Sequence, residues 1–203
     1  MTRKNLVGAA LAVLTTGLVL AGCGSETGSG HDMSTMQSTT SAAATQSGDR
    51  NDADVTFARG MIPHHIGALD MAKLVEGRTS NPKVLDLAAR IEKAQDPEIK
   101  IMTGWLKNWG AEVPATTGMP GMDHGDAGHG TDSAELEKLK HAKDAEFDTL
   151  FLVMMIKHHQ GAIDMSNTEL QQGRNAEAKE LAQRIVDGQQ AEIDEMKSLL
   201  PAG

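Results

Sequence analysis

The chain has 203 residues, of which 39% are hydrophobic and 23% charged, so it is long enough for one globular domain and its appendages. It contains three Phe, two Trp and no Tyr, whereas Met occurs 12 times. This composition favours helices over sheets. The formal net charge of -9 excludes a typical nucleic-acid-binding protein, because neutralising phosphates requires clustered Lys and Arg.

The first 22 residues predict a lipoprotein signal peptide. Arg3 and Lys4 precede an apolar run over residues 6–20, which is shorter than the roughly 20 residues that a membrane-spanning helix needs. The run ends in LAGC, which resembles a bacterial lipobox whose cysteine, Cys23, is lipidated (palmitate) and becomes the mature N-terminus. We therefore expect the protein outside the cytoplasm, anchored to the cell membrane. The alternatives are an uncleaved anchor or a cytosolic protein with an apolar start.

Cys23 is the only cysteine, and this limits the chemistry of the chain. Once it is acylated, no thiol remains for a disulfide, an iron–sulfur cluster or a thiolate zinc site. Any metal must therefore be held by His, Met, Asp or Glu. Residues 23–50 are rich in Gly, Ser, Thr and Ala, and we interpret them as a flexible tether.

One segment of the sequence occurs twice, as FARGMIPHHIGALDM over residues 57–71 and as FLVMMIKHHQGAIDM over residues 151–165. The similarity continues downstream, where each copy is followed by L-A-x-R-I and then by Q-x-x-E-I-x-x-M. A match of this length indicates that one unit of the chain has been duplicated. Whatever one His-His pair does, the other is expected to do.

Apolar periodicity and cap signals predict four helices, over residues 51–76, 82–109, 132–172 and 175–200. They divide the chain into a first helical hairpin, a Gly/Met/His linker and a second helical hairpin, over residues 51–110, 111–131 and 132–203. The predicted fold class is all-α, an antiparallel four-helix bundle in which two repeated hairpins form one domain over residues 51–203.

Each repeated segment combines His with Met on one helical face, which predicts a metal site. Imidazole suits copper, zinc, nickel and iron, whereas the thioether of Met selects monovalent copper or silver. The candidate ligands are His64, His65, Met61, Met71, His158, His159, Met155 and Met165. Adjacent side chains diverge by about 100° on a helix, so one His of each pair should point toward the other repeat. Glu98 and Glu192, at the edge of the inward seam, are weaker ligand candidates.

The simpler interpretation is that these residues are structural. A Met at helical spacing is usually core filler, and a His on an apolar face is usually a hydrogen-bonded core residue. Met and His also occur in the tether at residues 31–36 and in the linker at residues 119–129, and an ordinary polar linker is the alternative there.

The motifs MIPHH and MIKHHQGAIDM, with the L-A-x-R-I and Q-x-x-E-I-x-x-M patterns that follow them, resemble the bacterial family called domain of unknown function 305. The resemblance covers about residues 51–200. It implies a ferritin-like helical bundle, commonly exported, and some relatives are associated with copper binding and resistance. Carried over, it favours the same ligand set, His64, His65, Met61, Met71, His158, His159, Met155 and Met165.

The predicted function is copper sequestration, handling or resistance by an exported, lipid-anchored protein that is not an enzyme. The expected partners are the metal ion and the membrane, and another transition metal and a homo-oligomer stay open. One alternative is a metal-free helical interaction module. The other is a ferritin-like di-iron oxidase, but such sites use Glu-x-x-His pairs, which this sequence lacks.

Overall fold

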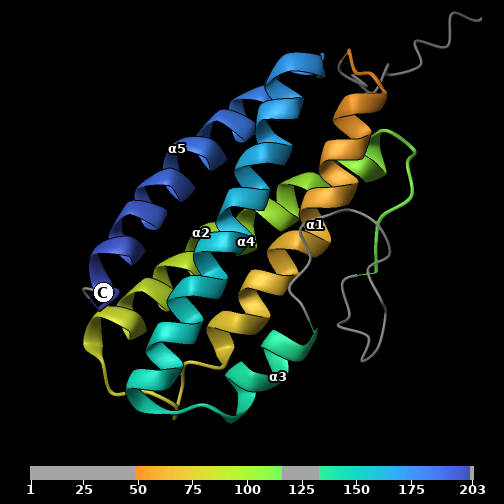
Figure 1. Ribbon diagram of the computed structural model, residues 1–203. Helices are drawn as coiled ribbons and strands as arrows, with labels where there is room; N and C mark the ends of the chain where they lie inside the picture. The colour runs from red at the N-terminus through yellow and green to blue at the C-terminus, as the bar shows by residue number, and fades with distance from the viewer. Residues whose placement is uncertain (1–48, 116–132, 202–203) are drawn as a thin grey trace, which may run out of the picture. The chain divides into compact units, whose positions relative to one another are not determined.

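A computed structural model describes residues 49–115 and 133–201. These residues form helices and no strands (Figure 1), which confirms the all-α prediction. The helices are α1 (Asp52–Lys73), α2 (Pro82–Asn108), α3 (Ser133–His141), α4 (Asp144–Gln172) and α5 (Ala176–Leu199). The predicted signal peptide, the lipid attachment at Cys23, almost all of the tether and most of the linker lie outside the described residues.

Helix packing brings the two repeated segments together. Helix α1 packs against α2, α4 packs against α5, and α1 also packs against α4. Figure 1 shows α1 and α4 running in opposite directions. One repeated segment lies on α1 and the other on α4, so this contact places one beside the other. Among the helices of the described residues, none is long and apolar enough to cross a membrane.

The predicted long third helix is wrong, because the chain breaks before Asp144. Asp144, the first residue of α4, has a φ of 52°, in the left-handed region, so a right-handed helix cannot continue through it from α3. Its backbone N–H donates to the carbonyl of Arg78 at 2.6 Å, which ties the break to the turn after α1. The result is a separate short helix, α3, held on the core by Leu139 and Ala142.

The core consists of two clusters of buried side chains. The first includes Ala68, Met71, Phe147, Phe151 and Met155. The second includes Phe57, Met61, Ile62, Met102 and Ala162, with Met165 packed against it. Along α1, the buried apolar residues before the His-His pair lie in the second cluster and those after it in the first. Along α4 the order is reversed, except for Ile163, which follows the pair and lies in the first cluster. The histidines therefore sit where the two clusters adjoin along each helix.

A buried carboxylate holds the start of α1 to the start of α5. The side chain of Asp54 accepts hydrogen bonds from the backbone of Asn51 at 2.5 Å, Arg174 at 2.9 Å and Asn175 at 2.8 Å. The Asn51 bond belongs to the capping box that begins α1. One side chain thus joins segments that are far apart in the sequence.

Candidate metal centre

The contact between α1 and α4 brings one histidine of each repeated segment together. The ring centroids of His64 and His158 are 3.8 Å apart, and their planes are inclined by 42°. The neighbouring ring of His65 is farther from His64, with 6.5 Å between centroids. We call His64 and His158 the imidazole pair.

The second histidine of each segment contacts a glutamate on the adjacent helix. Nε2 of His65 lies 2.7 Å from Oε2 of Glu98 on α2, and Nε2 of His159 lies 2.7 Å from Oε2 of Glu192 on α5. We call these the His–Glu pairs. From the sequence, Glu98 and Glu192 are predicted only as weaker ligand candidates, and this contact is not predicted. The signal that could have found it is the equal spacing from His to Glu in both copies, 33 residues.

Three of the four imidazoles carry a buried nitrogen that has no hydrogen-bond partner. These atoms are Nδ1 of His65, His158 and His159. The rings themselves are 0%, 5% and 0% exposed, so bulk water does not solvate these nitrogens. A buried polar atom without a partner costs about 1–3 kcal/mol. A cation that accepts the lone pair would remove that cost.

The electrostatics around His158 favour the neutral, ligating form of its imidazole. Burial, followed by the neighbouring charges of His64, His159 and His65, holds the pKa of His158 well below its ordinary value. A hydrogen bond with the backbone of His64 acts in the opposite direction but is the weaker effect. His158 is therefore neutral at physiological pH, and a cation need not displace a proton from it.

The predicted methionine ligands are divided between the two core clusters. Met71 and Met155 lie in the first cluster, and Met61 lies in the second with the partly buried Met165 against it. Of the four predicted sulfur ligands, each cluster thus holds one from α1 and one from α4. The structure places the eight predicted residues on two packed helices, but it does not gather all four sulfurs into one group.

The donor set fits a soft cation better than zinc. A structural zinc site takes four His, Cys or carboxylate ligands in a tetrahedron. Within residues 49–115 and 133–201, no group of three or more His, Cys, Asp or Glu side chains is placed to hold one ion. A site built on these imidazoles together with Met side chains of the same helices would suit monovalent copper or silver, which thioethers prefer.

Gly67 makes room for the imidazole pair. A Cβ atom at this position would lie 3.2 Å from Nε2 of His158, which is tighter than an ordinary van der Waals contact. We expect Gly67→Ala to displace the His158 ring and to lower the Cu(I) affinity by roughly 10-fold. The midpoint of thermal unfolding should change little, because the preference of a helix for Ala over Gly, up to about 1 kcal/mol, offsets the cost of moving the ring.

Gly188→Ala in α5 is the matched control, because a Cβ atom there would meet nothing within 4 Å. This variant should gain the same helix propensity and keep the Cu(I) affinity of the unmodified chain. Competition titration against a Cu(I) chelator, with thermal unfolding followed by circular dichroism, measures both quantities. An unchanged affinity in Gly67→Ala would show that the position of the His158 ring does not matter for binding.

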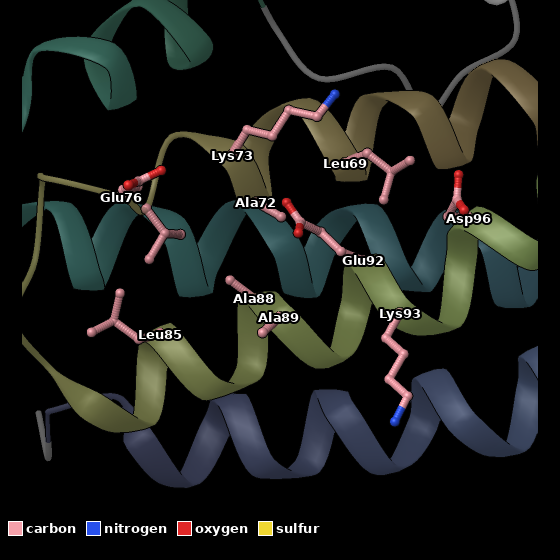
Figure 2. Close-up of a pocket in the computed structure, with 11 residues that line it drawn as sticks. Leu69, Ala72, Lys73, Glu76, Leu85, Ala88, Ala89, Glu92, Lys93 and Asp96 are labelled. Carbon is pink, nitrogen blue, oxygen red and sulfur yellow. The ribbon is translucent and has the colours of Figure 1, made fainter.

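A groove on the surface of α1 and α2 lies apart from these histidines (Figure 2). Its volume is about 780 Å³. Its lining is Leu69, Ala72, Lys73, Val75, Glu76, Leu85, Ala88, Ala89, Glu92, Lys93 and Asp96. It contains no His and no Met, and its charged side chains are of both signs. The groove therefore offers no soft ligand.

Comparison with known proteins places the chain in a family. The family described as Domain of unknown function (DUF305) matches residues 22–72 and 54–200. The chain belongs to the DUF305 family. A solved DUF305 protein of Streptomyces coelicolor, named as a secreted protein, is 30% identical and has a TM-score of 0.64. That match covers 73% of this chain and 90% of the other.

A second solved relative of this DUF305 chain binds metal ions. CopM in its Cu(I)-bound form is 33% identical, with a TM-score of 0.58, and the match covers 71% of this chain and 93% of CopM. CopM has also been solved in Cu(II)-bound and Ag-bound forms. An uncharacterized protein of Acanthamoeba polyphaga mimivirus is 40% identical over 53 residues, which is 26% of this chain and 35% of that protein.

Proposed function

We propose that this DUF305 chain is an exported copper-binding protein that sequesters or passes on the monovalent ion. The observation that carries the proposal is the set of buried Nδ1 atoms on His65, His158 and His159 that have no hydrogen-bond partner. They lie on the two helices that also carry the four predicted methionine ligands. Copper bound by CopM supports the same choice of metal.

The proposed ligands are the eight residues predicted from the sequence. The imidazole pair joins α1 to α4, and Met61, Met71, Met155 and Met165 supply sulfur from the two core clusters. Burial excludes water and favours a cation of low charge, because the Born cost of burying an ion rises steeply with charge. We assign no catalytic residue, because holding and releasing the ion requires no bond-making step.

The proposal includes the architecture and the cellular location. We propose that α1, α2, α4 and α5 form a ferritin-like four-helix bundle of two repeated hairpins, supported by the packing of α1 on α2, α4 on α5 and α1 on α4. Residues 1–22 act as the signal peptide, Cys23 carries the lipid, and residues 23–50 tether the domain to the membrane. The name of the Streptomyces coelicolor relative supports export.

Elemental analysis of the purified chain, followed by competition between Cu(I) and Cu(II), tests the function. We expect bound copper and tighter binding of Cu(I) than of Cu(II), because thioether ligands are soft. Bound iron with oxygen consumption would instead support a di-iron oxidase. Absence of any bound metal, together with failure to bind added Cu(I), would leave a metal-free interaction module.

A further inference from the structure

The His–Glu pairs repeat one arrangement at two places in the chain. In each pair the histidine side chain is fully buried, and the glutamate is largely buried, at 18% exposed for Glu98 and 16% for Glu192. Both contacts use Nε2 and Oε2, and both measure 2.7 Å. One pair joins α1 to α2, and the other joins α4 to α5. An accidental contact would not be expected to recur with the same atoms and the same length.

The contact determines which ring nitrogen is free to bind a cation. A carboxylate can only accept a hydrogen bond, so Nε2 of each histidine carries the hydrogen and donates it. In the neutral ring the lone pair then lies on Nδ1. Nδ1 of His65 and of His159 is buried and has no hydrogen-bond partner. Each ring thus presents one fixed, unused lone pair to the interior.

We propose that Glu98 and Glu192 are positioning residues of the copper site, which orient the rings of His65 and His159 and reserve Nδ1 for the ion. This inference rests on the proposed copper-binding function. The carboxylate also increases the donor strength of the ring, as it does where a metal-bound histidine donates its other N–H to a carboxylate. In this role Glu98 and Glu192 act on the ion through imidazole, since Oε2 of each contacts Nε2 of its histidine.

A purely structural contact between neighbouring helices is the competing explanation, and nuclear magnetic resonance separates the two. The full chain, labelled with ¹⁵N in histidine, is measured without metal and then with Ag(I), which is diamagnetic and soft. We expect His65 and His159 to be protonated at Nε2 before addition. On addition of Ag(I), the Nδ1 resonances should shift while Nε2 keeps its proton. Silver binding that shifts Nε2, or that leaves both rings unchanged, would overturn the inference.

The double variant Glu98→Gln/Glu192→Gln tests the same inference by affinity. Gln keeps the size of the side chain, but its amide can either donate or accept, so it no longer fixes the tautomer. We expect the Cu(I) affinity to fall by about 10- to 100-fold, as is typical when the hydrogen-bond partner of a metal-binding side chain is removed. In the metal-free double variant, the ¹⁵N spectrum should show both tautomers of His65 and His159.

Glu195→Gln is the matched control, because it makes the same change of charge on α5. Glu195 contacts Arg90 at 2.7 Å and no histidine, so its variant should bind Cu(I) as the unmodified chain does. If the unmodified chain binds neither Cu(I) nor Ag(I), the proposed function fails. If it binds both ions and the double Gln variant binds them equally well, only the positioning role of Glu98 and Glu192 fails.

Discussion

The double variant His64→Ala/His158→Ala is expected to bind Cu(I) at least about 100-fold more weakly than the unmodified chain, a loss of roughly 3 kcal/mol. The two rings lie 3.8 Å apart across the contact between α1 and α4, so an ion held there draws a ligand from both repeated segments. Removing both leaves no imidazole from this contact. Each substitution falls inside a long helix, where Ala is the most favourable residue, so helicity should be retained.

Competition titration measures the Cu(I) affinity, and far-ultraviolet circular dichroism measures the helicity. His141→Ala is the control, because His141 lies on α3 with its side chain 84% exposed and should not affect binding. Adding His65→Ala and His159→Ala to the double variant should abolish the tight binding that remains. If the double variant kept its full affinity, the copper site would have to lie elsewhere than at the imidazole pair.

Local sequence signals predicted most of the helices because they act within a few residues. Asn51 begins α1 with a capping box, and Asn81 and Pro82 begin α2. The break before Asp144 escaped prediction because its cause is not local. Its backbone N–H bonds to the carbonyl of Arg78, and only the folded chain brings the two residues together.

In the candidate site, too, features that depend on residues close in the sequence were predictable, whereas contacts between helices were not. Helical periodicity predicted that His and Met would share one face, and the chemistry of these side chains predicted a soft metal. Periodicity could not predict that His65 and His159 would bond to Glu98 and Glu192, because that depends on the register between neighbouring helices. The division of the methionines between two core clusters likewise depends on how α1 and α4 cross.

A second polar site, which no sequence motif singles out, links stability to pH. Glu169 on α4 is 1% exposed and lies against Asp54. Burial, the hydrogen bond to Asp54 and the charge of Asp54 raise the pKa of Glu169 to about 8, whereas Lys179 acts in the opposite direction. Burial also acts to raise the pKa of Asp54, but the hydrogen bonds that Asp54 accepts outweigh it and lower that pKa. At neutral pH, a protonated Glu169 therefore faces an ionised Asp54.

Raising the pH from 6 to 9 should consequently destabilise the chain. Because the folded state holds the proton of Glu169 more tightly than the unfolded state, this contribution is complete below pH 4.5 and is lost as the pH rises through about 8. The full shift corresponds to about 5 kcal/mol, of which at most about 3 kcal/mol is lost between pH 6 and 9. Asp54 has the opposite sign, since its contribution is present above pH 3.8 and is lost as the pH falls through its lowered pKa.

Glu169→Gln should remove most of this alkaline loss, because a neutral amide can still donate to Asp54 and cannot ionise. At pH 9 we expect the variant to be more stable than the unmodified chain by roughly 2 kcal/mol or more. Chemical unfolding across the pH range measures the difference, and Glu180→Gln at an exposed position of α5 is the control, which should follow the unmodified chain. If Glu169→Gln loses stability between pH 6 and 9 as steeply as the unmodified chain does, the alkaline loss originates elsewhere. If the stability of Glu169→Gln instead stays constant over this range, the proton shared between Asp54 and Glu169 stabilises the contact between the beginning of α1 and the junction of α4 and α5.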